Sequence, residues 1–189
     1  MKRRILVIDD ELHMLELLEH VLTEYTEHTV VTTNNSLEIN SILEKEQFDI
    51  IVTDLKMPGF DGLDVLNWIK DHDRPEEVII MTAFGSAETT DKARELGAFD
   101  YVKKPFRKEQ ILLSISRAER LLDARHSLQK LESILFSSDL GEAESRFREE
   151  YWKRLVQECD GNVEEIADIS GRPADEVATM VAKYHQKSE

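Results

Sequence analysis

Residues 5–11 read Ile-Leu-Val-Ile-Asp-Asp-Glu, an uninterrupted apolar run that ends in three carboxylates. A short run in which every side chain is apolar is typical of a strand buried on both faces of a parallel sheet. Similar runs recur further along the chain, at residues 29–32, 50–53, 78–81 and 101–102. The sequence therefore predicts five parallel strands before residue 105.

The segments between these runs have the spacing of helices. Their leucines and isoleucines recur every three or four residues, as at Leu12, Leu15, Leu18 and Leu22, and again at Leu63, Leu66 and Ile69. Strands that alternate with helices indicate a doubly wound, flavodoxin-like α/β fold with helices on both faces of the sheet.

The composition and net charge of the chain argue against several classes of function. The 189 residues are 41% hydrophobic and 33% charged, an ordinary globular balance, but the net charge is −15. Such a surface repels phosphate, which argues against nonspecific binding to nucleic acid or anionic membranes. The single cysteine, Cys159, excludes an internal disulfide. The first apolar run stops at Asp9, far short of the roughly 20 residues that span a bilayer, so we expect a cytoplasmic protein with no membrane contact.

Polar residues follow the predicted strands where each one ends. They are Asp9 and Asp10, then Asp54, then Thr82, then Lys104. In doubly wound sheets these strand ends share one pocket. Carboxylates that converge need a neutralising charge, and Mg²⁺ prefers oxygen ligands. A lysine and a hydroxyl opposite them suit a transferred phosphoryl group, with an aspartate as the nucleophile.

Each of these residues has a plainer interpretation. An acidic pair after a strand is often a helix N-cap, and Asp10 could partly cap a helix from Glu11. A Lys-Pro pair is usually a turn, and Lys56 is equally well a solvated loop lysine or a side chain that alters hydrolysis of an acyl phosphate. The order of all the residues at the correct strand ends favours the phosphoryl site. A metal-dependent phosphohydrolase would need an Asp-x-Asp motif, and Lys56 occupies its second position.

Four blocks of sequence resemble the signature of a response-regulator receiver domain: residues 5–11, 53–62 (TDLKMPGFDG), 81–83 (MTA) and 101–106 (YVKKPF). The resemblance covers residues 1–121. It implies that Asp54 accepts phosphate from a sensor histidine kinase or phosphotransfer protein, and that the chain promotes only its own phosphorylation and dephosphorylation. The roles it implies are Mg²⁺ binding by Asp10, Asp54, the backbone carbonyl of Lys56 and, through water, Asp9; phosphoryl contact by Lys104 and Thr82; and switching by Thr82 and Tyr101.

Beyond residue 108 the pattern changes. Ile111, Ile115, Ala118 and Leu122 form a face that should pack on the sheet. A second set with 3,4,3,4 spacing then follows, at Leu121, Ala124, Leu128, Leu131 and Leu135. We expect a linker helix over residues 108–136 that pairs with a second copy as a short coiled coil, rather than an amphipathic helix on its own domain. Residues 137–146 are interpreted as a hinge.

Residues 140–184 resemble the small all-α, Fis-like helix-turn-helix tail of NtrC-type transcription regulators, which is dimeric; we place this domain at residues 147–189. The residues that carry the resemblance are 141–144 (GEAE), Phe147, Tyr151, Gly161, Asn162, Ala167, Gly171, Val177, Val181 and Tyr184. No Gly-x-x-x-x-Gly-Lys-Ser/Thr loop occurs in the 189 residues, so the central ATPase module of that family is absent from them.

The charge of this tail differs from what is usual in the NtrC-type family. Its second motif helix should enter the major groove, yet Ala174 stands where arginine is usual and Asp175 would face phosphate. Residues 147–189 hold six Lys or Arg against ten Asp or Glu. The DNA-contact candidates are Arg172, Thr179 and Lys183. Two outputs remain open: a dimeric transcription regulator, or a phosphorelay module whose tail dimerises or docks a protein without binding DNA.

Overall fold

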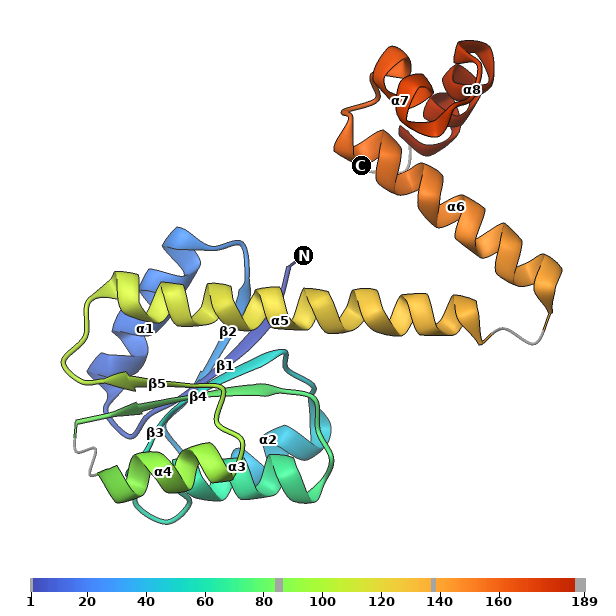
Figure 1. Cartoon of the computed structure of the whole chain (residues 1–189). Helices are drawn as coiled ribbons and strands as arrows, with labels where there is room; N and C mark the ends of the chain where they lie inside the picture. The colour runs from blue at the N-terminus through green and yellow to red at the C-terminus, as the bar shows by residue number, and fades with distance from the viewer. Residues whose placement is uncertain (1, 84–86, 137–138, 186–189) are drawn as a thin grey trace. The chain divides into compact units, whose positions relative to one another are not determined.

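The computed structural model describes residues 2–83, 87–136 and 139–185, and it divides into two compact units, residues 1–124 and 125–189 (Figure 1). Each unit has its own apolar core. Among the described residues, no helix combines the length and apolar character that crossing a membrane requires.

The first unit contains a five-stranded parallel sheet with the order β2-β1-β3-β4-β5. This confirms the five strands predicted from the apolar runs. Their bounds are β1 Arg4–Ile8, β2 Thr29–Thr33, β3 Ile50–Asp54, β4 Glu77–Thr82 and β5 Asp100–Lys103. The three inner strands β1, β3 and β4 are almost entirely buried, which explains why apolar residues follow one another along them instead of alternating with polar ones.

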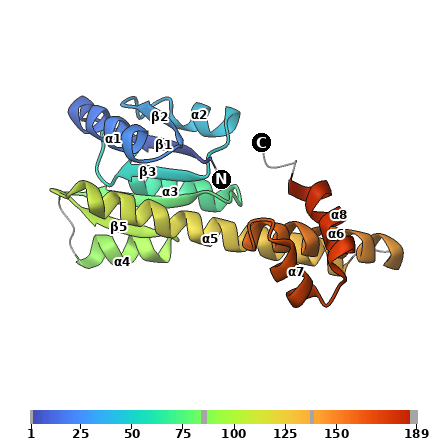
Figure 2. The same cartoon turned by 90° about the horizontal axis from the view of Figure 1, so that it is seen from above.

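Helices cover both faces of the sheet, and Figures 1 and 2 show them in two groups. They are α1 Leu12–Tyr25, α2 Ile39–Lys45, α3 Gly62–Asp71, α4 Ala87–Glu95 and α5 Lys108–Leu135. One core lies under α1 and α5, and the other under α2, α3 and α4. Leu15, Leu18 and Leu22 of α1 are buried as their spacing predicts, whereas Leu12 is exposed.

Helix α3 begins in a capping box beside the end of β3. The Asp61 carboxylate accepts hydrogen bonds from the backbone N–H groups of Leu63 and Asp64, at 2.9 and 3.1 Å. The Asp64 carboxylate in turn accepts one from the N–H of Asp61, at 2.9 Å. Such reciprocal capping stabilises a helix start by about 1 kcal/mol and fixes where it begins.

Helix α5 contributes to both units. In the first, Ile111, Ile115 and Ala118 are buried and Leu122 is partly buried against the sheet, as predicted. Further along, Leu128 is 61% exposed and Leu131 is 49% exposed. Among the residues with 3,4,3,4 spacing, Ala124, Leu128 and Leu131 are therefore exposed and Leu121 is partly buried. Whether a second copy covers them stays a prediction. The side chain of Leu135 lies outside the described residues.

The second unit consists of the end of α5 with α6 Leu140–Glu158, α7 Val163–Ser170 and α8 Ala174–His185. Its core is small, and the buried side chains are Trp152, Leu155, Val156, Cys159, Ile166, Val177 and Tyr184. Helix α7 begins at an Asn162 cap and ends at Gly171, whose φ of 64° lies in the left-handed region that favours glycine.

The hinge predicted for residues 137–146 is wrong over the part that is helical. Helix α6 already begins at Leu140, because the Asp139 carboxylate accepts hydrogen bonds from the N–H groups of Gly141 and Glu142, at 2.7 and 3.2 Å. The aspartate and glycine that resemble a turn are thus the cap and first turn of a helix. Residues 137 and 138 lie outside the described residues.

Candidate functional site

Three side chains meet at the carboxyl edge of the sheet. The Lys104 ammonium nitrogen Nζ lies 2.6 Å from Asp9 Oδ2 and 2.6 Å from Asp54 Oδ1. All three side chains are buried or nearly so. Two carboxylates therefore share one ammonium in a site that water hardly reaches, where each charge interaction is stronger than at the surface.

Three strand ends at the same edge of the sheet hold these groups in place. Asp54 is the last residue of β3, Asp9 directly follows β1, and Lys104 directly follows β5. The Asp9 carboxylate accepts a hydrogen bond from the Glu11 N–H at 3.0 Å, and Asp54 Oδ2 accepts one from the Lys56 N–H at 2.7 Å. The Lys104–Pro105 peptide bond is cis.

Burial and hydrogen bonds shift the pKa values of Asp9 and Lys104. Burial raises the pKa of the Asp9 carboxyl group, although the hydrogen bonds from Lys104 and from the Glu11 N–H act against that shift. Burial alone would lower the pKa of Lys104, but the hydrogen bonds and charges of Asp54 and Asp9 outweigh it, and the pKa is raised. Lys104 is therefore held as a cation at neutral pH.

The donor set suits a hard divalent cation. Two buried carboxylates against one ammonium leave an excess of negative charge, and carboxylate and carbonyl oxygens are the ligands that Mg²⁺ prefers. The carboxylates are not, however, gathered as a ready metal cage. Within the described ranges, no three His, Cys, Asp or Glu side chains form a group that could hold a metal ion.

Asp10 differs from its neighbour. Its side chain is exposed, while that of Asp9 is fully buried. The alternative that Asp10 caps the first helix is wrong, because Glu11 occupies the N-cap of α1 and no side chain bonds there. Lys56 is also exposed, and its backbone N–H bonds to Asp54.

Thr82 and Tyr101 lie on neighbouring strands at the same edge. Thr82 is the buried last residue of β4 and is in register with Lys103 of β5, while Tyr101 is in register with Ile80. The Tyr101 hydroxyl is buried and has no hydrogen-bond partner within the described part of the chain. Tyr101 also lines a cavity of about 120 Å³ between α4 and β5. A tyrosine hydroxyl without a partner is costly to bury.

Sequence reasoning missed the role of Gly62. A Cβ atom at this position would lie 2.5 Å from the backbone oxygen of Asp54 and 3.1 Å from the Cα atom of Leu55. Only glycine therefore allows the first turn of α3 to approach strand β3 this closely. The signal was the Asp61-Gly62 pair in the block of residues 53–62, which combines a cap with a residue that lacks a side chain.

The three DNA-contact candidates each interact within their own unit. Arg172 Nη1 lies 3.8 Å from Glu176 Oε2, and the Arg172 N–H donates to Ser170 Oγ at 3.3 Å. The Thr179 hydroxyl donates to the backbone oxygen of Asp175 at 3.1 Å, and Lys183 Nζ lies 5.0 Å from the centre of the Tyr184 ring.

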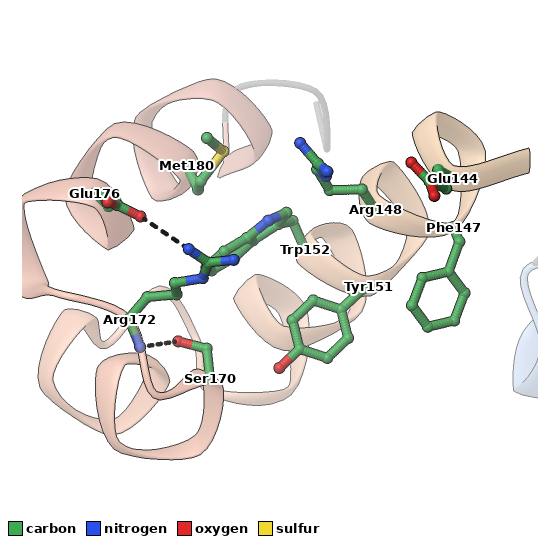
Figure 3. A pocket seen from close by; sticks show the side chains of 9 residues that line it. All are labelled: Glu144, Phe147, Arg148, Tyr151, Trp152, Ser170, Arg172, Glu176 and Met180. Carbon is green, nitrogen blue, oxygen red and sulfur yellow. Dashed lines mark hydrogen bonds and ion pairs between the residues drawn. The ribbon is translucent and has the colours of Figure 1, made fainter. Parts of the chain in front are cut away.

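Arg172 also lines a pocket of about 450 Å³ in this unit, shown in Figure 3. The other lining residues from α6 are Glu144, Phe147, Arg148, Tyr151 and Trp152; Ser170, Glu176 and Met180 complete the wall. The pocket thus combines aromatic rings with two arginines and two glutamates, so its charges balance.

A doubly wound parallel sheet with a lysine between two carboxylates at its carboxyl edge defines a phosphoacceptor signalling domain. The chain belongs to the response regulator receiver domain family, whose profile matches residues 5–116. Its receiver is therefore that of the response regulators of two-component systems.

Three known proteins show how far the similarity extends. Regulatory protein AtoC of Escherichia coli is 30% identical over 135 residues, which are 71% of this chain and 29% of that protein. Sporulation initiation phosphotransferase F of Bacillus subtilis is 35% identical over 111 residues, 59% of this chain and 89% of that protein. The crystal structure of NtrX from Brucella abortus superposes with a TM-score of 0.64 at 24% identity, covering 82% of this chain and 34% of that one, which shows fold alone. The chain thus spans less than a third of AtoC.

Proposed function

We propose that this chain is a cytoplasmic response regulator whose receiver, residues 1–121, accepts a phosphoryl group on Asp54 from a sensor histidine kinase or a phosphotransfer protein. One observation carries the proposal: the ammonium group of Lys104 lies 2.6 Å from both Asp54 and Asp9 at the carboxyl edge of the sheet. A nucleophilic carboxylate beside a fixed cation is what phosphoryl acceptance needs.

The transfer follows from these positions. A carboxylate oxygen of Asp54 attacks the phosphorus atom of the donor. The bond from phosphorus to the donor nitrogen breaks, and its electron pair stays on that nitrogen, which takes up a proton. Lys104 offsets negative charge on the phosphoryl oxygens, and for this its nitrogen must exchange a carboxylate oxygen of Asp54 for a phosphoryl oxygen.

Magnesium fits the same edge. Asp10, Asp54 and the backbone carbonyl of Lys56 would hold it, with Asp9 reaching it through water. When bound, Mg²⁺ supplies positive charge that offsets the added phosphoryl group. Burial of Asp9 and Asp54 keeps their oxygens in a site of low dielectric, where that neutralisation has a large effect.

Phosphorylation would be relayed through Thr82 and Tyr101. The Thr82 hydroxyl turns to a phosphoryl oxygen, and Tyr101 turns into the space that this opens. The hydroxyl of Tyr101 without a partner, and the small cavity that its ring lines, support a side chain with two arrangements. The surface of α4, β5 and α5 would then carry the signal.

The test is the intact mass of the chain after incubation with acetyl phosphate and Mg²⁺. We expect a gain of one phosphoryl group that is lost on treatment with hydroxylamine, and no gain in the Asp54→Asn variant. Asp71→Asn, an exposed aspartate at the end of α3, is the matched control and should behave as wild type. An equal gain in the Asp54→Asn variant would reject the proposal.

For the output, we propose a homodimer that joins the linker helix, residues 108–136, to a Fis-like helix-turn-helix tail, residues 147–189, and acts in transcription regulation without an ATPase module. The Asn162 cap, the left-handed Gly171 and the core around Trp152 support the motif. The regulatory relative AtoC supports the role. Phe147 and Tyr151, exposed and stacked on α6, support an apolar dimer face.

A second output is a protein-binding tail that does not contact DNA. Its specific support is that Arg172, Thr179 and Lys183 all interact within their own unit, while acidic residues begin both α7 and α8. A DNA mobility shift at rising salt separates the two. DNA binding should weaken steeply with salt through counterion release, whereas no shift even at low salt favours the protein-binding tail.

A further inference from the structure

A network of charged side chains holds α5 at the edge of the sheet opposite the phosphoacceptor site. In a parallel sheet all strands start at the same edge, and each of three neighbouring strands contributes a residue from just before its start: Arg3 before β1, His28 before β2 and Asp49 before β3. Helix α5 contributes Glu119 and Asp123. We call these five residues the amino-edge socket.

Their contacts form one connected set. Arg3 Nη1 lies 3.0 Å from Asp49 Oδ1, and the second guanidinium nitrogen, Nη2, pairs with Asp123. His28 Nε2 lies 2.9 Å from Glu119 Oε1, and the Arg3 N–H donates to His28 Nδ1 at 3.3 Å. Arg3 therefore bonds through its side chain to α5 and through its backbone to the histidine that holds the previous turn of α5.

The Arg3 and His28 side chains are more buried than those of ordinary surface pairs, although Asp123, the partner of Arg3 on α5, is 56% exposed. The Arg3 side chain is 12% exposed and that of His28 is 7% exposed. Ion pairs at the surface contribute little because water screens them and the side chains are mobile, whereas hydrogen-bonded charges that are largely buried are held in one geometry. The Arg154–Glu158 pair of α6, with side chains 76% and 55% exposed, is an ordinary surface pair.

The socket lies where α5 stops packing on the sheet. The last buried apolar side chain of α5 in the first unit is Ala118, and Leu122 is partly buried. From Asp123 to Lys130 every residue is exposed, and the first compact unit ends at Ala124. Glu119 and Asp123 therefore occupy the final turn and a half that this unit can hold. Both Figures 1 and 2 show the start of β1 beside α5.

We infer that the amino-edge socket is a positioning device for α5: it fixes the point and direction at which the helix leaves the receiver. The apolar stripe alone leaves the helix free to roll or fray beyond Leu122, because dispersion contacts are not directional. Two polar contacts one helical turn apart, the Arg3–Asp123 ion pair and the His28–Glu119 hydrogen bond, are anchored next to three separate strands and remove that freedom. The inference concerns the receiver alone and does not depend on what the tail binds.

The test is hydrogen exchange of the α5 amides, measured by mass spectrometry on the full chain. In Arg3→Gln we expect amides from residue 119 to residue 127 to exchange about tenfold faster, the change that loss of a partly buried, charge-assisted contact produces. Arg4→Gln is the matched control. It makes the same change one residue later on the same strand, but Arg4 pairs with Glu46 and bonds to the backbone of Gln47, not to α5.

A second variant guards against loss of folding. Asp123→Asn alters an exposed carboxylate on α5, at 56% side-chain exposure, and leaves the core untouched. It should speed exchange over the same amides, and the double variant Arg3→Gln/Asp123→Asn should add little to either change alone. Faster exchange spread evenly over the receiver, or equal effects of Arg3→Gln and Arg4→Gln, would overturn the inference, because either result means that Arg3 only stabilises the fold.

Discussion

The two units of this chain use their charged side chains in opposite ways. In the receiver, Asp9, Asp54 and Lys104 come from three strand ends and converge in a buried site. In the second unit, most ion pairs join residues four apart on one exposed helix, such as Arg146 with Glu142. A sheet brings distant charges together, whereas a short helix pairs neighbours and exposes its aromatic rings. The difference supports the proposals that phosphoryl chemistry belongs to the first unit and association to the second.

The largest effect should come from Lys104→Met, which leaves two buried carboxylates facing each other without their cation. Breaking a buried pair on one side costs about 3 kcal/mol, so the free energy of unfolding should fall by that amount in magnesium-free buffer, and phosphorylation should fail. Urea denaturation followed by circular dichroism measures the free energy of unfolding, and intact mass measures phosphorylation. The neighbouring exposed Lys103→Met is the control and should change stability by less than about 0.5 kcal/mol. Equal losses in both variants would contradict the buried ionic site.

Next in size is Gly62→Ala. The added Cβ atom meets the Asp54 backbone oxygen at 2.5 Å, so the backbone must move, at a cost of about 2 kcal/mol in unfolding free energy and a slower phosphorylation rate. The second unit supplies the contrast. In Gly141→Ala the new atom meets only an Asp139 oxygen at 3.2 Å, and alanine favours a helix, so stability should be unchanged or slightly higher. If Gly62→Ala lowers the unfolding free energy no more than Gly141→Ala does, the contrast between the two units is wrong at this point.

A smaller effect is expected on the α6 face. Phe147 is 58% exposed, so Phe147→Ser should leave the fold intact but raise the dissociation constant of the dimer about tenfold, since exposed aromatics often dominate association. Sedimentation equilibrium measures this dissociation constant. Leu37→Ser removes an apolar side chain that is 84% exposed in the receiver, and should leave the dimer unchanged. A strictly monomeric wild-type chain, phosphorylated or not, would exclude the dimer altogether.

The smallest effect should be that of Arg154→Gln. It removes a pair with Glu158 that spans 2.8 Å between largely exposed side chains. Water screens such exposed pairs and they contribute little to stability, so the urea midpoint should barely move. A loss near that of Lys104→Met would mean that the charges of the second unit are not screened as the comparison requires.

The sequence was sufficient for the sheet and the buried trio, for a physical reason. Runs such as residues 50–52 are apolar at every position only when both faces of the strand are covered, and parallel strands all end at one edge. Asp9, Asp54 and Lys104 could therefore be brought together although 95 residues separate the first from the last. Asp10 shows the limit. Which of two adjacent carboxylates faces inward depends on the backbone after the strand, and the pattern does not record it.

The second unit was harder to predict because its signals are ambiguous. The 3,4,3,4 spacing from Leu121 is the same whether a second copy or the chain itself covers the helix. In the structure, Ile134, which is not part of that spacing, is the buried residue near the end of α5, where Lys130 lies 2.5 Å from Glu150 of α6. The excess of acidic over basic residues in the tail is visible in the sequence. The internal contacts of Arg172 and Thr179 are not, because they depend on the folded structure.

The most direct measurement of the central claim is chemical mapping of the acyl phosphate. After incubation with acetyl phosphate and Mg²⁺, borohydride reduces a phosphorylated aspartate to homoserine, and peptide fragmentation locates it. The buried carboxylate–lysine site predicts homoserine at position 54 and at no other aspartate. Homoserine at Asp9 or Asp10, or none at all in a folded chain, would contradict it.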